Sequence, residues 1–243
     1  MRIATWNLER PRKGGEIKNA LLLQRMREID ADIWVLTEAS EAVFLPGYYA
    51  VATPPLDGYH RPGETSTAVL SRWPIIGEAP TWDPRLSVCA KVAAPSGTVH
   101  VYGTIIAYAN DKGQSETSKR WVEHRRSIEK HRSDWLKLSQ SHSSQTPLVV
   151  AGDFNQSRDG SGWYQDKFSV DLLSDVLRQS GLQCVTEQDF RKTQGLSRAS
   201  IDHICLPEQL AGCVSKVAAW EGAVDGRAVS DHNGVYVQID ISR

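Results

Sequence analysis

Seven polar side chains of the 243-residue sequence stand at or just after the ends of short apolar segments. The set comprises Asn7, Glu38, Asp153, Asn155, Asp202, Asp231 and His232. Strand ends are the places where α/β folds collect ligand-binding groups. Taken alone, an Asp or Asn after a strand is usually a turn former, and a Glu there is usually a solvated charge. The repetition of the pattern is what indicates a functional site.

Carboxylate and amide oxygens dominate this set, and they are the donors that suit Mg²⁺ or Mn²⁺. Zinc is not favoured, because the four cysteines form no CxxC pair and no Cys/His cluster at zinc spacing. Asp153 and Asn155 are two residues apart, so an extended backbone would aim both to one side while Phe154 turns into the core. We therefore expect a divalent-cation site, with Mg²⁺ as the cofactor and Mn²⁺ as its substitute.

His232 differs from the other histidines because it follows Asp231 and can be aligned by a second carboxylate. Such a histidine serves as a general base or a phosphate ligand, and proton transfer of this kind contributes ~10² to 10⁴ in rate. His203 is expected to pack or to face solvent, because it points away from Asp202 on an extended strand. The sequence has no Gly-x-Ser-x-Gly motif and no Walker A loop, which leaves activated water as the nucleophile.

These side chains must be positioned by strands that alternate with helices. Apolar and β-favouring runs predict strands at 2–8, 33–37, 67–71, 99–106, 148–151, 200–206, 214–220 and 235–241. Helical periodicity or composition predicts helices at 17–29, 116–138 and 170–179, and the Ser-rich stretch 139–145 is expected to be a loop. The pattern is typical of a layered α/β fold, and no linker divides residues 1–243, so we expect a single domain.

The overall charge does not identify a polyanionic partner. Lys and Arg total 28 against 29 Asp and Glu, for a formal net charge of −1, so a nucleic-acid substrate requires a local basic patch. One candidate is the basic helix expected to include Arg120, although a solvated amphipathic helix explains the same residues at least as well. Arg191 and Arg198, in the loop before the Asp202 strand, form a second candidate patch.

The N-terminal residues lead directly into strand-like sequence, without the charged head and long apolar run of a leader. No stretch of eighteen consecutive apolar residues occurs, and no apolar or basic anchoring element is evident. We expect a cytoplasmic monomer without a membrane anchor.

Six blocks in order along the chain resemble the motif series of the endonuclease/exonuclease/phosphatase superfamily, the fold of deoxyribonuclease I and of AP endonucleases. The blocks are Ala4-Thr5-Trp6-Asn7, Leu36-Thr37-Glu38, Ala68 to Ile75, Ala151-Gly152-Asp153-Phe154-Asn155, Ile201 to Ile204, and Ser230-Asp231-His232. The resemblance implies a four-layered α/β sandwich, in which two packed, mostly antiparallel sheets are flanked by helices.

The resemblance also implies roles for the residues. Glu38 would bind the metal with help from Asn7, and Asp231 would complete the metal shell. Asp153 would activate the water or protonate the leaving oxygen, and Asn155 would hydrogen-bond the phosphate or the nucleophile. Asp202 would orient His232, which would act on the nucleophile or on the developing phosphorane charge.

The sequence departs from the family pattern at the end of a central strand. Many members have Asn-x-His-Leu there, whereas this chain has Ile105 at the histidine position. AP endonucleases use a tyrosine in this region, so Tyr108 either contacts phosphate through its hydroxyl or simply packs at the strand end. The sequence leaves both readings open.

The substrate is less determined than the chemistry, because members of this superfamily cleave many kinds of phosphoester. We expect a nuclease acting on DNA or RNA. The alternative is a phosphomonoesterase or phosphodiesterase acting on a small nucleotide, a sugar phosphate or a lipid headgroup. A non-catalytic binding module is disfavoured because every acidic motif residue is present. The continuation Glu38-Ala39-Ser40 differs from that of AP endonucleases, so the sequence does not favour AP endonuclease activity in particular.

Overall fold

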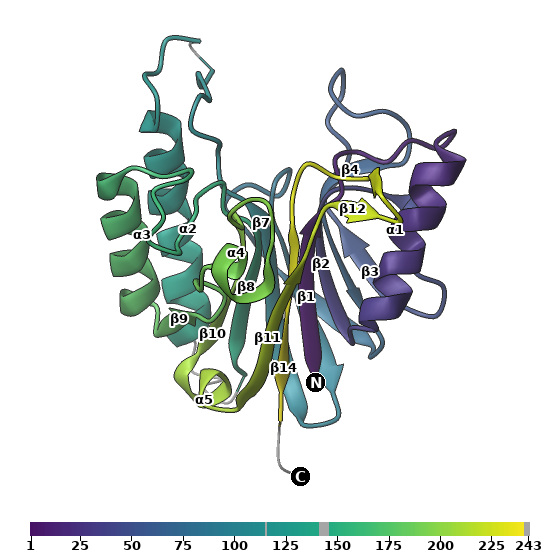
Figure 1. Ribbon diagram of the computed structural model, residues 1–243. Helices are drawn as coiled ribbons and strands as arrows, with labels where there is room; N and C mark the ends of the chain where they lie inside the picture. Colours follow the sequence, from purple (N-terminus) through teal and green to yellow (C-terminus); the bar gives the residue numbers. More distant parts are fainter. Residues whose placement is uncertain (115, 141–145, 241–243) are drawn as a thin grey trace.

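Two sheets packed face to face form the centre of the molecule, and helices lie on their outer faces (Figure 1). The computed structural model describes residues 1–114, 116–140 and 146–240. Within these residues, each of the two large sheets has six strands, and most neighbouring strands are antiparallel. The predicted four-layered α/β sandwich is therefore confirmed.

The first sheet has the strand order β11-β14-β1-β2-β4-β3. Its central strands β1 and β2 run parallel, and the other neighbours in the described sheet are antiparallel. The strands are β1 (Arg2–Asn7), β2 (Ile33–Ser40), β3 (Tyr49–Ala52), β4 (Glu64–Ser71), β11 (Val214–Trp220) and β14 (Gly234–Ile239).

The second sheet has the order β5-β6-β7-β8-β10-β9 and again contains a central parallel pair, β7 with β8. A separate hairpin joins β12 (Ala223–Val224) to β13 (Arg227–Ala228). The strands of the second sheet are β5 (Ile75–Ala79), β6 (Val88–Ala94), β7 (Gly97–Ile105), β8 (Leu148–Asp153), β9 (Leu182–Cys184) and β10 (Asp202–Pro207).

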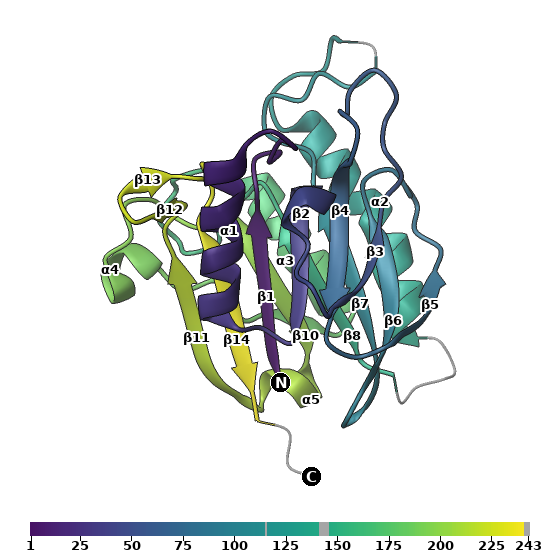
Figure 2. The same ribbon diagram turned by 90° about the vertical axis from the view of Figure 1, so that its right-hand side faces the viewer.

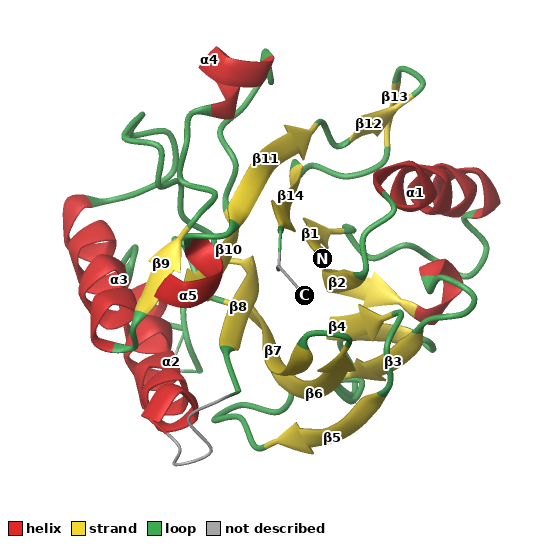
Figure 3. Ribbon diagram, turned by 90° about the horizontal axis from the view of Figure 1, so that it is seen from below, coloured by secondary structure: helices red, strands yellow, loops and turns green. Residues whose placement is uncertain are grey.

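Helices cover both outer faces. The helix α1 (Glu16–Ile29) lies over the first sheet, whereas α2 (Val122–Gln140) and α3 (Lys167–Gln179) lie over the second (Figures 2 and 3). The N-cap residue of α3 is Asp166, whose carboxylate accepts a hydrogen bond from the Ser169 backbone amide. The short elements are the 3₁₀ helix η1 (Glu41–Val43), α4 (Phe190–Gln194) and α5 (Glu208–Ala211).

The alternation of side chains along β1 separates two apolar cores. Ile3 belongs to the cluster between the two sheets, which also contains Val101 and Val149. Trp6 belongs to the cluster beneath α1 and packs with Leu22. Complete burial of such side chains stabilises the fold by about 1.5–3 kcal/mol each, so a shift of one residue in the β1 register would be strongly unfavourable.

A third core lies between the second sheet and its helices. Phe154 is fully buried there and packs with Trp135 and Leu173. Since Phe154 stands between Asp153 and Asn155, its burial anchors the segment that carries both polar side chains. The sequence-based expectation that Phe154 turns into the core is confirmed.

The predicted helix over 116–138 is wrong at its start. The helix α2 begins at Val122, and Glu116 and Trp121 adopt the left-handed backbone conformation, with φ of 55° and 68°. The Trp121 amide hydrogen-bonds to the carbonyl of Ala109, which fixes this segment as a loop folded over the end of β7. Of the predicted loop 139–145, residues 139 and 140 belong to α2 and 141–145 lie outside the described residues.

Gly152 allows β8 to bring Asp153 to its end position. Its φ is 139°, and a Cβ atom at this position would lie 2.0 Å from the carbonyl oxygen of Thr104. No side chain can be accommodated at that separation, and the backbone conformation is itself essentially restricted to glycine. The Gly-Asp-x-Asn segment is therefore shaped by close contact between β8 and β7.

In the part of the chain that the structure describes, no helix combines the length and the apolar character needed to cross a membrane.

Candidate active site

Strand ends from both sheets bring the predicted polar residues together. Asn7 is the last residue of β1 and Asp153 the last of β8, whereas Asp202 is the first residue of the antiparallel strand β10. Asp202 is the direct cross-strand partner of Asp153. His232 lies in the loop before β14, which pairs with β1. The sandwich thus places residues from three strands, and one from the loop before a fourth, at one edge.

The Asn7 amide links the two sheets at this edge. Its Nδ2 donates to Asp153 Oδ2 at 3.1 Å and lies 3.4 Å from Glu38 Oε1. Its Oδ1 accepts from the Glu9 backbone amide at 2.9 Å. Glu38 lies inside β2, not at its end, because the strand continues to Ser40, and Glu38 itself adopts a φ of 45°.

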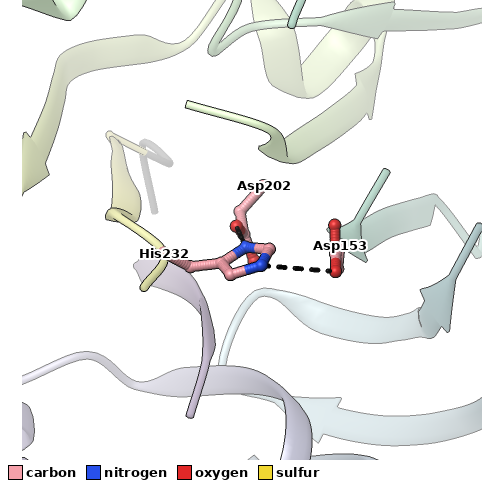
Figure 4. A group of neighbouring side chains, drawn as sticks. All are labelled: Asp153, Asp202 and His232. Atoms are coloured by element: carbon pink, nitrogen blue, oxygen red, sulfur yellow. Dashed lines mark hydrogen bonds and ion pairs between the residues drawn. The ribbon is translucent and has the colours of Figure 1, made fainter. Parts of the chain in front are cut away.

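The His232 ring lies between the carboxylates of Asp202 and Asp153 at the centre of the site (Figure 4). His232 Nδ1 lies 2.6 Å from Asp202 Oδ2, and Asp202 is fully buried. On the opposite side of the ring, His232 Nε2 lies 3.9 Å from Asp153 Oδ2. The first contact is a short charge-assisted hydrogen bond. The second is an ion-pair contact that is too long for a direct hydrogen bond.

The charges of the buried acids set the protonation of His232. Burial lowers the pKa of the imidazole, but the carboxylates of Asp202 and Asp153 outweigh burial and raise its pKa to about 10. Burial raises the pKa of Asp153 to about 7, with the charge of His232 opposing this rise and that of Asp202 adding to it. At neutral pH, His232 is therefore cationic, and Asp153 can exchange a proton near that pH.

The chemistry of the donor set fits a hard divalent cation at Glu38. The carboxylates of Glu38 and Asp153 both approach the Asn7 amide, and together they offer oxygen atoms of the kind that Mg²⁺ binds. Asp153, Asp202 and His232 also have potential ligand atoms within 4.8 Å of one another. His232 Nδ1 and Asp202 Oδ2 are engaged with each other at 2.6 Å, so the oxygen donors beside Asn7 are those of Glu38 and Asp153.

Asn155 and Asp231 occupy different positions around this centre. The side-chain nitrogen of Asn155, Nδ2, donates to Asp153 Oδ2 at 3.1 Å and to the Ile106 carbonyl at 3.0 Å, so Asn155 holds Asp153 in place. The Asp231 side chain is 64% exposed, with Oδ1 3.9 Å from His232 Nε2. Asp231 therefore stands at the rim of the site, where its predicted role in the metal shell remains a prediction.

A cavity of about 460 Å³ opens over the reacting groups. Ile105 lines it at the end of β7, so an apolar side chain stands where family members carry histidine. Tyr108 also lines the cavity with 51% of its surface exposed, a position that fits the phosphate-contact reading better than core packing. The cavity is lined by Arg10, Glu38, Tyr59, His60, Ser66, Leu86, Ile105, Ala107, Tyr108, Asp111, Asp153, Asn155, Tyr164, Ile201, Asp231 and His232.

The three arginines expected to bind substrate have different surroundings. Arg120 lies in the loop before α2, over the Trp121 ring, and does not line the cavity. Arg191 is engaged in ion pairs with Asp189, two residues earlier, and with Asp159, and Asp189 also pairs with Lys192. Arg198 hydrogen-bonds to the Asp231 backbone carbonyl and is exposed, which leaves it next to the site.

Two residues that sequence reasoning missed stand out. Ser230 accepts a hydrogen bond from the His232 amide at 3.0 Å and donates to the Asn7 carbonyl at 2.6 Å, so it ties the His232 loop to β1. Its place within the Ser-Asp-His block was a usable signal. Arg10 lies 3.2 Å from Glu38 and follows Asn7 by three residues, in a basic stretch that carries no motif of its own.

Residues 4–232 match the Endonuclease/Exonuclease/phosphatase family. None of the curated protein sequences compared with the chain matches it.

Several solved structures resemble the fold over almost the whole chain. The 3′ phosphatase NExo from Neisseria, bound to a product DNA hairpin, has a TM-score of 0.71 at 17% identity and covers 99% of this chain and 100% of its own. An AP endonuclease from Archaeoglobus fulgidus scores 0.70 at 16% identity, with coverage of 99% and 100%. The endonuclease domain of TRAS1, a telomere-specific non-LTR retrotransposon, scores 0.67 at 18% identity, with coverage of 100% and 99%.

Proposed function

Because the chain belongs to the endonuclease/exonuclease/phosphatase family, we propose that it is a divalent-metal-dependent nuclease that hydrolyses phosphodiester bonds of DNA or RNA with activated water. Membership of this family bears out the coarser prediction, hydrolysis of phosphoester bonds. The observation that carries the proposal is the chain of contacts from Asp202 through His232 to Asp153, which opens into the cavity.

In the proposed reaction, His232 presents a positive charge to the phosphate. Its pKa of about 10 keeps the ring protonated at neutral pH, and Asp202 fixes the ring through Nδ1, so the Nε2–H group is directed towards Asp153 and the cavity. A preorganised cation in a buried site stabilises the extra negative charge of a phosphorane more than it stabilises the ground state. This role agrees with the predicted action of His232 on the developing phosphorane charge.

Asp153 is the proton-transfer group in this proposal. Its pKa of about 7 allows it to take a proton from water or to give one to the leaving oxygen at neutral pH. Asn7 and Asn155 both donate hydrogen bonds to Asp153 Oδ2, so the orientation of the carboxylate is fixed before substrate binds. Such positioning removes part of the entropic cost of the proton transfer.

Glu38 would hold the metal, with Asn7 beside it and Asp231 at the rim. When bound, a Mg²⁺ or Mn²⁺ ion supplies positive charge that polarises the phosphoester and lowers the pKa of water. All three predicted ligands carry oxygen donors, which supports Mg²⁺ over zinc.

The shape of the site favours a polymeric substrate over a small phosphoester. The catalytic cavity shares Arg10, Glu38 and Tyr59 with a neighbouring cavity of about 530 Å³. That second cavity adds Arg12, Lys18 and Arg61 as well as Glu9 and Glu64, so basic side chains continue beyond the reacting centre among acidic ones. An extended, partly basic groove suits successive phosphates of a nucleic-acid strand. Arg198 is a further proposed contact for substrate phosphate, next to Asp231 at the rim of the site. Arg120 is less suitable because it does not line the cavity, and Arg191 because it is engaged with carboxylates.

A substrate screen tests the proposal. Purified protein is incubated with Mg²⁺ or Mn²⁺ and with single-stranded DNA, double-stranded DNA, RNA, bis-p-nitrophenyl phosphate, nucleotides and phospholipids. We expect chelator-sensitive cleavage of a nucleic acid, and we expect Asp153→Asn to reduce it by ~10² to 10⁴ because the proton-transfer group is lost. Cleavage of nucleotides alone would replace the nuclease with the small-molecule alternative, and full activity of Asp153→Asn would contradict the roles proposed here.

The site draws on both sheets, which supports treating residues 1–243 as one domain. The monomeric state and the cytoplasmic location stay predictions from the sequence.

A further inference from the structure

Arg10 engages the carboxylate that is proposed to hold the metal. Its Nε lies 3.2 Å from Glu38 Oε2, and each of the two side chains is 32% exposed. The guanidinium carbon lies 4.0 Å from the centre of the Tyr59 ring, and Nη2 is hydrogen-bonded to the Tyr59 hydroxyl. Arg10 is therefore held between an acid and an aromatic face at the junction of the two cavities.

The backbone that carries Arg10 is built to reach Glu38. Glu9 and Arg10 both adopt the left-handed conformation, with φ of 51° and 48°, which is uncommon for residues other than glycine. The surroundings hold this conformation through two hydrogen bonds: the Glu9 amide donates to Asn7 Oδ1, and the Arg10 amide donates to the Glu38 carbonyl, both at 2.9 Å. The loop after β1 thus fixes Arg10 beside Glu38 through its main chain as well as its side chain.

A guanidinium and a divalent cation compete for the same carboxylate. Either one neutralises Glu38: Arg10 pairs with Oε2, whereas Oε1 faces Asn7, and a cation bound to this carboxylate would weaken its ion pair with Arg10. Once released, a guanidinium that is exposed at the cavity wall needs a new anion, and phosphate matches its fork of donors well. The adjoining cavity is lined by Arg12, Lys18 and Arg61 against Glu9 and Glu64, so a phosphate that enters it would meet further basic side chains.

We propose that Arg10 is the counter-ion of Glu38 in the metal-free protein, that metal binding displaces it, and that the released guanidinium then binds a substrate phosphate in the adjoining cavity. This inference rests on the proposed function, because it requires Glu38 to be a metal ligand. Metal and substrate then strengthen each other's binding. The metal occupies Glu38, which competes with phosphate for Arg10, and the phosphate occupies Arg10, which competes with the metal for Glu38. Arg10 acts in this scheme by binding and release, without a part in proton transfer.

Metal affinity without substrate tests the first half of the inference. Mn²⁺ is titrated by calorimetry into wild type, Arg10→Ala, Arg12→Ala and Glu38→Gln. We expect Arg10→Ala to bind Mn²⁺ about 5- to 10-fold more tightly, because the competitor is gone. Arg12→Ala removes the same charge from the same groove without a contact to Glu38, so its affinity should change less than about 2-fold.

The outcomes separate this inference from the proposed metal site. Suppose that Glu38→Gln binds Mn²⁺ much more weakly than wild type, but that the Mn²⁺ affinity of Arg10→Ala equals that of wild type or of Arg12→Ala. The counter-ion role of Arg10 is then overturned, whereas Glu38 remains a metal ligand. If Glu38→Gln binds as well as wild type, the metal assignment itself fails, and the inference fails with it.

Oligonucleotide binding tests the second half. Fluorescence anisotropy with a single-stranded oligonucleotide is measured in the Asp153→Asn background, with and without Mg²⁺ at matched ionic strength. We expect Mg²⁺ to tighten binding in this background and the Mg²⁺ effect to disappear when Arg10→Ala is added, whereas adding Arg12→Ala should weaken binding and keep the effect. A Mg²⁺ effect that persists without Arg10 would overturn the transfer of the guanidinium to phosphate.

Discussion

Replacing Asp202 with Asn removes one negative charge from the fully buried end of the Asp202–His232 pair while keeping the side-chain volume. The carboxylate lies 2.6 Å from His232 Nδ1, and its charge is the largest influence that raises the pKa of His232 to about 10 against the effect of burial. Loss of an opposite charge at this distance lowers a pKa by about 1–3 units. In the variant, the pKa of His232 should therefore fall to between about 7 and 9.

Two measurements follow from this change. If protonated His232 stabilises the transition state, the alkaline limb of the pH–rate profile should move down by the same 1–3 units, roughly. The maximal rate should also fall about 10- to 100-fold, because the ring loses the partner that orients it. The assay is hydrolysis of bis-p-nitrophenyl phosphate between pH 6 and 11, roughly spanning both pKa values, combined with an NMR titration of the His232 ring.

The free energy of unfolding should also depend on the protonation of His232. The pKa of His232 is raised in the folded protein, so its charged form contributes stability that is fully present below about pH 6.5 and is lost as pH rises through about 10. At 1.36 kcal/mol per unit, the predicted shift corresponds to about 1.4–4 kcal/mol at neutral pH. Urea unfolding should therefore show a gap between wild type and Asp202→Asn that narrows as pH approaches 10, roughly the folded pKa.

Asp231→Asn provides a matched control. Its carboxylate lies 3.9 Å from His232 Nε2, but the side chain is 64% exposed, so water screens its charge. The alkaline limb should move far less than in Asp202→Asn. Coinciding pH–rate profiles and ring titrations for wild type and Asp202→Asn would refute the reasoning.

Two structural substitutions give further checks. Gly152→Ala places a Cβ atom 2.0 Å from the Thr104 carbonyl oxygen and should destabilise the fold by at least about 3 kcal/mol in urea unfolding, whereas unchanged stability would contradict the close contact between β7 and β8. Ser230→Ala removes the hydroxyl between the His232 amide and the Asn7 carbonyl and should cost about 1–3 kcal/mol with a fall in turnover. A fully active variant of wild-type stability would show that Ser230 does not hold the loop.

Most of the site was predictable because its residues follow apolar segments whose strand character is strong. Asp153 and Asp202 are far apart in sequence, yet each adjoins a buried strand, and antiparallel pairing of those strands makes them neighbours. The sequence could not show how near His232 comes to both acids, since that depends on the packing of one sheet on the other.

The failures have local physical causes. The segment before Val122 has helical composition, but a tertiary hydrogen bond from Trp121 to Ala109 pulls it into a loop and takes Arg120 off the helix. Arg191 is a charged residue in the sequence, but in the fold its side chain is engaged with the carboxylates of Asp189 and Asp159. A patch of charged residues in a sequence does not show which charges pair with each other in the fold. Of the three arginines predicted to bind substrate, Arg198 is the one that lies next to the site.

The parallel pairs at the centre of the sheets have an evolutionary consequence. Adjacent parallel strands require a crossover, and the described residues of the two crossovers include α1 between β1 and β2 and α2 between β7 and β8. The first part of each crossover rises from a carboxyl strand end beside the reacting groups, and these two segments carry Arg10 and Tyr108. Insertions there would lengthen a loop without shifting strand register, so a lineage with this sandwich can acquire new substrates while its hydrolytic centre stays fixed.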